Sequence, residues 1–166
     1  MIEQLRIDER LIHGQVALVW SKELNTQHNI VFNDKAATDQ ATSVTLQMAL
    51  PAGQKLLVRS MDQAEELLRN PKVGQTRIFA LVTNVSDALR LVKSSRTEIK
   101  EVNLANCGRF DGSPVESKKK LTRNIMLSPE ELAAAEELCE IDIPFFCQVI
   151  PDDPKVPVRK LLEAEK

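Results

Sequence analysis

The sequence predicts a three-layer α/β fold with a mostly parallel, doubly wound sheet and helices on both faces. Short apolar runs alternate with helical segments along the whole chain, as in repeated strand–helix–strand units. The run 77–83, RIFALVT, is apolar almost throughout, which is typical of a parallel strand buried on both faces. No repeat or linker divides the chain, so residues 1–166 are predicted to form one domain.

The first half of the chain alternates regularly. Strands are expected at 2–7, 28–33, 55–60 and 77–83. Helices are expected where apolar residues recur at helical spacing, over 14–25, 38–50 and 61–70. Pro51 and the pair Asn70–Pro71 should end the second and third helices, because proline cannot continue a helix from within.

The second half should begin with a helix over 87–94 that Ser86 caps. A strand over 101–106, a polar loop over 107–120 and a strand over 123–128 follow. Ser128, Pro129 and Glu131 are start signals for a helix over 129–140. The chain should close with a strand over 143–150 and a proline-rich tail that finishes in a short helix.

Composition excludes several classes of protein. The 22 basic and 24 acidic residues give a net charge of -2, so nothing favours nucleic acid or an anionic membrane as partner. No apolar run is long enough to cross a bilayer. The acidic start, MIEQLRIDER, is unlike a signal peptide, which predicts a cytoplasmic protein.

The cysteines and histidines do not indicate a metal or a disulfide. Three cysteines without CxxC spacing make a zinc site or disulfide framework a poor interpretation. Cys139 and Cys147 have apolar neighbours and should be buried, whereas Cys107 has polar neighbours and should be more exposed. The two histidines show no ligand spacing, so neither metal nor cofactor is predicted.

The stretch RIDERLIHGQVALVW, from Arg6 to Trp20, is the most informative one. His13 stands at the start of a predicted helix, where unpaired N–H groups and the helix dipole favour an anion such as phosphate. The dipole disfavours a protonated imidazole, which leaves a usable nucleophile. Arg10 can neutralise a phosphoryl group, and Gly14 lets a donor come close.

His13 and Asp34 both follow predicted strands directly and should therefore meet at the same edge of the sheet. The local chemistry leaves an alternative open, in which His13 is an ordinary turn histidine bonded to its neighbours. His28 is interpreted as a surface turn residue. Asp8 either orients the arginines or is solvated, and Glu9 is predicted to be solvated.

RIDERLIHGQV resembles, nearly residue for residue, the active-site signature of the enzyme IIB component of the mannose/fructose/sorbose family of the bacterial sugar phosphotransferase system. Supporting segments are similar to other parts of that family: VFNDKAATDQ (31–40), MALPAG (48–53), EVNLAN (101–106) and the run 149–152. The first motif is specific, and together the matches span almost the whole chain.

The resemblance implies a cytoplasmic domain that takes a phosphoryl group from a phosphorylated IIA domain and passes it to a sugar at a membrane IIC–IID complex. It implies that His13 is phosphorylated, at Nδ1, and that Arg10 stabilises the phosphate. Asp8 matches an acidic member of the same loop, and Asp34 matches a residue that faces it. A homodimer is possible, and the resemblance does not indicate which sugar is used.

Two segments depart from the family pattern. Lys35 stands where many relatives have an acidic residue. NLANCGRFDGSP lacks the common Gly-Asn-Met or Gly-Gly-Met pattern, which is either neutral drift or a change in sugar specificity; loops at this edge carry ligand contacts, which favours specificity. The basic run 117–120 is interpreted as a solvated charge run.

Two other functions are alternatives to phosphotransfer. A regulatory or ligand-binding α/β module remains an alternative, although no GxGxxG or GxxxxGK loop supports nucleotide binding. A hydrolase that uses His13 as general base lacks a GxSxG elbow. The presence of both His13 and Arg10 favours the phosphocarrier.

Overall fold

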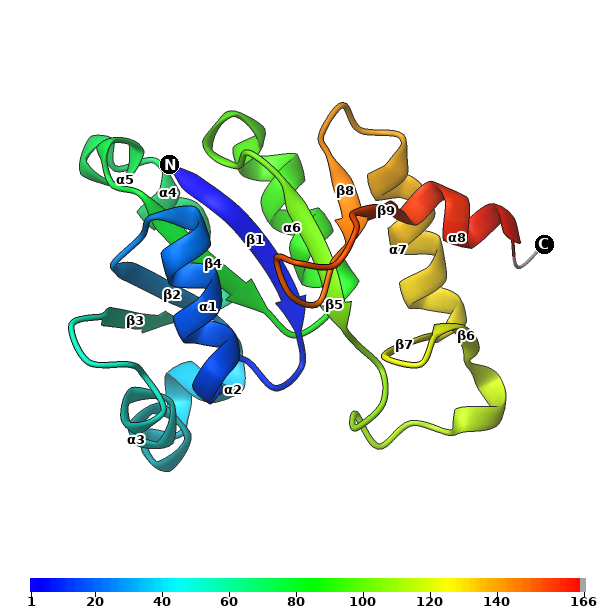
Figure 1. The fold of residues 1–166 in the computed structure, drawn as a ribbon, viewed down its shortest axis with the longest axis horizontal. Helices are drawn as coiled ribbons and strands as arrows, with labels where there is room; N and C mark the ends of the chain where they lie inside the picture. Colours follow the sequence, from blue (N-terminus) through cyan, green and yellow to red (C-terminus); the bar gives the residue numbers. More distant parts are fainter. Residues whose placement is uncertain (165–166) are drawn as a thin grey trace.

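The central sheet has seven strands in the order β3-β2-β4-β1-β5-β8-β9 in a computed structural model that describes residues 1–164 (Figure 1). All neighbours pair in parallel except β8 and β9. The α/β prediction is therefore confirmed. The strands are β1 (Ile2–Asp8), β2 (His28–Phe32), β3 (Lys55–Arg59), β4 (Ile78–Val82), β5 (Val102–Asn106), β8 (Phe145–Cys147) and β9 (Val156–Pro157).

Helices cover both faces of this sheet. The α-helices are α1 (Gly14–Leu24), α2 (Asp34–Thr38), α3 (Gln40–Met48), α4 (Met61–Leu68), α5 (Pro71–Gln75), α6 (Val85–Ser95), α7 (Pro129–Cys139) and α8 (Val158–Ala164), and 3-10 turns lie at Arg96–Glu98 and Val115–Ser117. Among the residues described, none of these helices combines the length and apolar character that a membrane span requires.

Two hydrophobic clusters separate the layers. One joins α1, α2 and α3 to the sheet, and the other joins α4, α6, α7 and α8 to the opposite face. Strand β4 shows the division: Phe79 and Leu81 point into the first cluster, and Ala80 and Val82 into the second. This is the two-residue period of a strand buried on both faces.

The connections that follow the neighbouring strands β1 and β4 run to opposite faces of the sheet. The chain leaves β1 for α1 on one face and leaves β4 for α6 on the other, so that α1 lies in front of the sheet and α6 behind it (Figure 1). Such a reversal opens a crevice beyond the strand ends, where α/β proteins bind ligands.

Some predicted boundaries were wrong in the first half of the chain. The helix expected over 38–50 is divided at Asp39, whose backbone is extended and whose carboxylate caps α3 through Ala41 N–H. Asn70 and Pro71 end one helix but also begin α5, because the Asn70 side chain caps Lys72 N–H and proline fits the first turn.

The predicted cap of α6 was also wrong. Asn84, not Ser86, caps this helix: its backbone is extended and its side-chain oxygen accepts a 2.8 Å hydrogen bond from Asp87 N–H. Ser86 lies inside the first turn and binds the Glu131 carboxylate.

The second half differs more. The strand predicted over 123–128 pairs antiparallel with the basic run in a separate hairpin, β6 (Lys119–Thr122) and β7 (Ile125–Leu127). The strand predicted over 143–150 stops at Cys147, because the Asn103 side chain takes both the N–H and the C=O of Gln148. The tail then adds the unpredicted strand β9.

Candidate functional site

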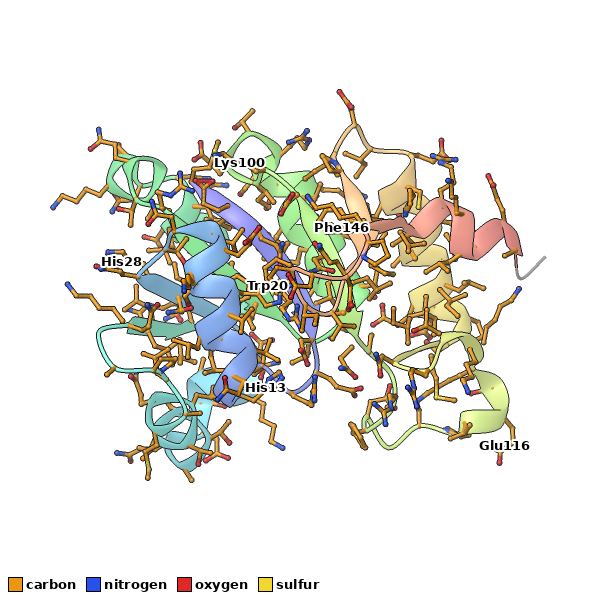
Figure 2. All side chains as sticks on the ribbon, viewed as in Figure 1. His13, Trp20, His28, Lys100, Glu116 and Phe146 are labelled. Carbon is orange, nitrogen blue, oxygen red and sulfur yellow. The ribbon has the colours of Figure 1, made fainter. Side chains whose placement is uncertain are left out.

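The turn between β1 and α1 carries the predicted site. Leu11, a buried residue, has a positive φ of 57°, and Gly14 has a φ of 30°. A left-handed non-glycine residue costs about 1–3 kcal/mol and is a common feature of functional turns. The turn places His13 at the N-cap of α1, at the carboxyl edge of the sheet, whereas His28 lies at the start of β2 (Figure 2).

Asp8 is the centre of this turn. Its side chain is fully buried, and its Oδ2 accepts hydrogen bonds from Arg6 Nε and Nη2 at 3.3 and 3.2 Å. Its Oδ1 accepts from Arg10 N–H at 3.0 Å and from Arg10 Nε at 3.4 Å. Asp8 therefore orients the arginines rather than being solvated, which resolves one of the alternatives left open by the sequence.

Arg6 is a site residue that the sequence reasoning missed. Its guanidinium is fully buried and lies 5.6 Å from the Trp20 ring centre, and both side chains donate to Val149 C=O. Burial lowers the pKa of Arg6, although Asp8 opposes this shift. A signal was present: an arginine within a buried strand needs a carboxylate on the same face, and Asp8 stands two residues on.

The imidazole of His13 is about one-quarter exposed, with 28% of its surface accessible. Its Nδ1 lies 2.9 Å from Leu11 C=O, and because a carbonyl only accepts, Nδ1 carries the proton here. Nε2 is buried without a hydrogen-bond partner among residues 1–164 and lies 4.0 Å from Asp8 Oδ2. Phosphorylation at Nδ1 therefore requires the bond to Leu11 to break and the ring to turn.

The surroundings of His13 suit an anion. No side chain caps the N-terminus of α1 within the described chain, so N–H groups of its first turn have no helical partner. The space beside Gly14 is open: an added Cβ would meet nothing within 4 Å. Arg10 keeps 41% of its side chain exposed. An open, positively charged position thus lies beside the imidazole.

A cleft of about 620 Å³ runs along the same edge of the sheet. Arg10 and Leu11 line one side, the ends of β2 and β4 contribute Asn33 and Thr83, and the segment after β5 closes the cleft. His13 is not among the lining residues, so the cleft adjoins the turn through Arg10.

Asp34 lies at the predicted edge but is used differently from the expectation. Its Oδ1 accepts a 2.8 Å hydrogen bond from Met61 N–H and so ties the start of α2 to the start of α4. The structure thus brings Asp8, Arg10, His13 and Gly14 into one turn, while Asp34 is oriented toward α4.

Glu9 was predicted to be solvated, and this was wrong. Its carboxylate accepts hydrogen bonds from Arg109 and Phe110 N–H at 2.9 and 3.0 Å. The two backbone donors lie one hundred residues along the chain, so no local pattern indicated them.

Two other surface predictions were wrong for the same reason. Lys118 belongs to the run interpreted as solvated, yet 2% of its side chain is exposed and its ammonium binds Asp111. Cys107 is buried rather than exposed, and burial raises its thiol pKa strongly. Cys139 and Cys147, which were predicted to be buried, are only partly buried. Burial still raises the pKa of the Cys147 thiol to about 12. These thiols are poor nucleophiles.

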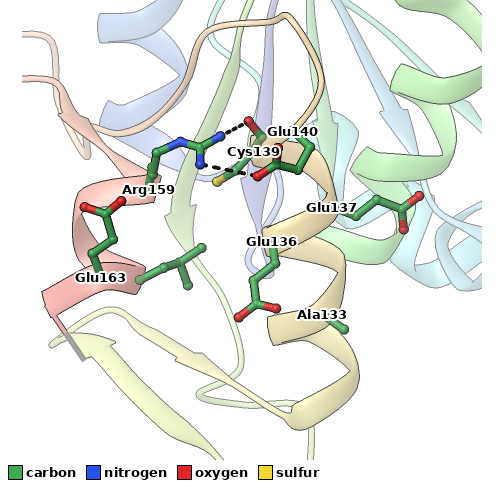
Figure 3. A pocket seen from close by; sticks show the side chains of 8 residues that line it. Ala133, Glu136, Glu137, Cys139, Glu140, Arg159 and Glu163 are labelled. Atoms are coloured by element: carbon green, nitrogen blue, oxygen red, sulfur yellow. Dashed lines mark hydrogen bonds and ion pairs between the residues drawn. The ribbon is translucent and has the colours of Figure 1, made fainter. Parts of the chain in front are cut away.

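A second hollow, of about 410 Å³, lies between α7 and α8 (Figure 3). Arg159 crosses it and binds Glu140 and the Cys139 carbonyl. Several glutamates line it, but across residues 1–164 no three or more His, Cys, Asp or Glu side chains are arranged to hold a metal ion. The hollow is remote from the β1–α1 turn.

Fold and site together define a mostly parallel α/β protein with a histidine and an arginine at the N-terminus of the first helix. The model of the PTS system sorbose subfamily IIB component matches residues 2–166. A probable phosphotransferase enzyme IIB component of Streptococcus pyogenes is 45% identical over 98% of this chain and 99% of its own.

Two further relatives agree. The crystal structure of the IIBSor domain of the sorbose permease from Klebsiella pneumoniae superposes with a TM-score of 0.89 at 32% identity, over 100% of this chain and 98% of that one. The mannose-specific EIIAB component of Escherichia coli is 30% identical over 95% of this chain and 47% of its own length.

The chain belongs to the sorbose subfamily of IIB components of the sugar phosphotransferase system. It is a phosphotransferase that takes part in sugar uptake. The family resemblance stated from RIDERLIHGQV is confirmed.

Proposed function

We propose that His13 accepts a phosphoryl group from a phosphohistidine of a IIA domain and passes it to a sugar at a membrane IIC–IID complex. One observation carries this proposal: His13 stands at the uncapped start of α1, with Arg10 half-exposed beside it and the buried carboxylate of Asp8 behind it. Phosphoryl transfer needs alignment and charge stabilisation more than covalent chemistry, and these groups supply both.

Loading begins with the ring turning away from Leu11. The Nδ1 proton leaves to solvent and another is taken up on Nε2, which lies 4.0 Å from Asp8 Oδ2 before the ring turns, so that Nδ1 presents its lone pair. Nδ1 attacks phosphorus as the phosphorus–nitrogen bond of the donor breaks, and that electron pair returns to the donor imidazole. Arg10 and the first N–H groups of α1 neutralise the phosphoryl charge.

Discharge reverses the roles. A sugar hydroxyl attacks phosphorus, the bond to Nδ1 breaks, and its electron pair returns to the ring. The hydroxyl proton leaves to solvent. In this scheme Gly14 leaves room for the donor, because the space beside it is open. Asp34 acts indirectly, since it anchors α2 at the edge of the site.

The partners follow from the same scheme. The mannose relative carries the name EIIAB on one chain about twice as long, which supports a IIA domain as donor. We propose that the reaction takes place in the cytoplasm, next to the membrane complex that presents the sugar. We further propose that residues 1–166 act as a single domain.

Intact-mass spectrometry tests the carrier role directly. The chain is incubated with phosphoenolpyruvate, the general phosphotransferase proteins and IIA; the wild type should gain one acid-labile phosphoryl group. His13→Ala should gain none, and the matched control His28→Ala should behave as the wild type. Nitrogen NMR of the phosphorylated chain should place the group on Nδ1. Failure of the wild type with several active IIA partners would favour the regulatory or ligand-binding alternative.

A further inference from the structure

Phe110 is an exposed aromatic side chain on a loop that is held firmly in place. Its side chain is 67% exposed and lies on the lining of the cleft. Its backbone is fixed by the carboxylate of Glu9, which accepts from both Arg109 and Phe110 N–H. Glu9 is the immediate neighbour of Arg10, so the turn between β1 and α1 positions the backbone that carries this ring.

The loop is anchored at its base as well. Gly108 has a φ of 80°, and a Cβ there would lie 1.7 Å from Met126 C=O, so only glycine fits. The buried ammonium of Lys118 binds Gly108 C=O at 2.5 Å and Asp111 at 2.6 Å. Burial of a charged group is costly unless the group is paired, and here the bonds of the ammonium both offset that cost and hold the loop in one conformation.

The orientation of the ring is set from one side. The guanidinium of Arg109 lies 5.0 Å from the ring centre of Phe110, in a cation–π contact. One face of the ring therefore contacts Arg109, while the residue as a whole stays 67% exposed.

The cleft beside the ring offers complementary polar groups. Thr83 Oγ1 accepts hydrogen bonds from the Asn33 and Asn84 side chains, so its own O–H is left to donate. Glu131 lines the same cleft, and within residues 1–164 both of its hydrogen bonds with Ser86 use Oε2, which leaves Oε1 as an acceptor.

These groups match the chemistry of a sugar. A pyranose or furanose ring presents hydroxyl groups that donate and accept at its edge and a C–H surface that packs on an aromatic face. The cleft volume of about 620 Å³ falls within the usual range for small-molecule sites, about 300–1,000 Å³. Small-molecule sites are concave and combine apolar side chains with a few placed polar groups, and Leu46 and Met126 supply apolar lining beside the hydroxyl, amide and carboxylate groups of this cleft.

We infer that the cleft between Arg10 and Phe110 is the subsite of this chain for the acceptor sugar, with Phe110 as the platform and Glu9 as its positioning residue. The inference rests on the proposed function, because an acceptor sugar must lie beside Arg10 only if His13 carries the phosphoryl group. The sugar would receive that group while it is held partly by this chain and partly by the membrane partner.

The test separates the two half-reactions. Loading from phosphorylated IIA is measured first; discharge is then measured with membranes that contain IIC–IID, over a range of sorbose or mannose concentrations. Phe110→Ala should load at the wild-type rate but discharge about tenfold more slowly at low sugar, as expected for the loss of one aromatic contact. Phe110→Tyr, which keeps the ring face, should restore discharge.

Two further variants sharpen the result. Val115→Ala is the matched control, because Val115 is 56% exposed on the same segment but does not line the cleft. It should discharge as the wild type. Glu9→Gln should reproduce the Phe110→Ala defect in part, since the two N–H groups bind different carboxylate oxygens and glutamine replaces one of these oxygens with an NH2 group, which only donates.

The outcomes are distinguishable. A wild-type chain that never loads contradicts the proposed function. Normal loading with normal discharge of Phe110→Ala overturns the sugar subsite alone. If Phe110→Ala raises the amount of IIC–IID membrane needed but not the sugar concentration, the ring contacts the protein partner, and the sugar subsite is again overturned.

Discussion

At the scale of single residues, the pair formed by Arg6 and Asp8 determines the site. Both side chains are fully buried, and Asp8 in turn holds the backbone and the guanidinium of Arg10. A buried ion pair adds little net stability over an apolar pair, but loss of one partner leaves an uncompensated charge. Arg6 therefore helps to position Arg10 and His13 through Asp8, although its own side chain is fully buried.

Substitution of Arg6 by methionine should destabilise the protein strongly. It leaves the Asp8 carboxylate buried with only Arg10 as a charged hydrogen-bond partner, and we expect a loss of about 3–5 kcal/mol in the free energy of unfolding, measured with urea. Arg90→Met removes the exposed ion pairs with Asp62 and Glu65 and should change stability little. Equal effects of the two substitutions would contradict a structural role for the buried pair.

At the scale of elements, the segment from Cys107 to Lys118 is the least regular part of the edge that forms the site. It has only one short 3-10 turn, so its shape depends on side chains: Glu9 at its start, and the ion pair between Lys118 and Asp111 across it. Burial raises the pKa of Asp111, but hydrogen bonds from Lys118 and Ser113 outweigh this and lower it to about 2.

This depressed pKa predicts an acid-sensitive contribution to stability. The ionised carboxylate stabilises the fold at pH values above its ordinary pKa of 3.8, and this contribution disappears as the pH falls toward about 2. Wild type should therefore exceed Asp111→Asn in Tm above pH 4, and the two curves should converge toward pH 2. Because Asp111 is half-exposed, screening keeps the difference small.

The control for this measurement is Asp152→Asn, which replaces an exposed carboxylate at the other end of the chain. Its Tm profile should run parallel to the wild type between pH 4 and 2. A gap between wild type and Asp111→Asn that stays constant over this range would show that the carboxylate does not act through its ionisation.

At the scale of the whole molecule, one sheet carries both hydrophobic clusters. Residues of β2 and β4 alternate between the clusters, so neither layer of helices can detach without exposing a face of the same strands. The single tryptophan, Trp20, lies in the cluster under α1 and is almost completely buried. It reports on one layer only.

Unfolding should therefore be a single transition. Trp20 fluorescence, which follows the α1 layer, and far-ultraviolet circular dichroism, which follows all helices, should give the same midpoint in urea. Calorimetry should show an unfolding enthalpy on the order of 115 kcal/mol near 60 °C, equal to the van't Hoff value. Two separate midpoints would contradict the proposal that residues 1–166 act as one domain.

The sequence alone determined the fold class, the order of most elements and the position of His13 at the start of a helix. These features depend on local information: the spacing of apolar residues, the turn signals and the RIDERLIHGQV segment all act within a few residues. Side-chain period and helix capping are short-range effects, so the residues that determine them stand next to one another in the sequence.

Only the tertiary structure decided the strand order, the burial of Arg6 against Asp8 and Trp20, the capture of Arg109 and Phe110 by Glu9, and the burial of Lys118. Each depends on segments that folding brings together from distant parts of the chain. A charged side chain is predicted to be solvated because its burial is costly without a partner. The sequence does not show a distant group that offsets this cost.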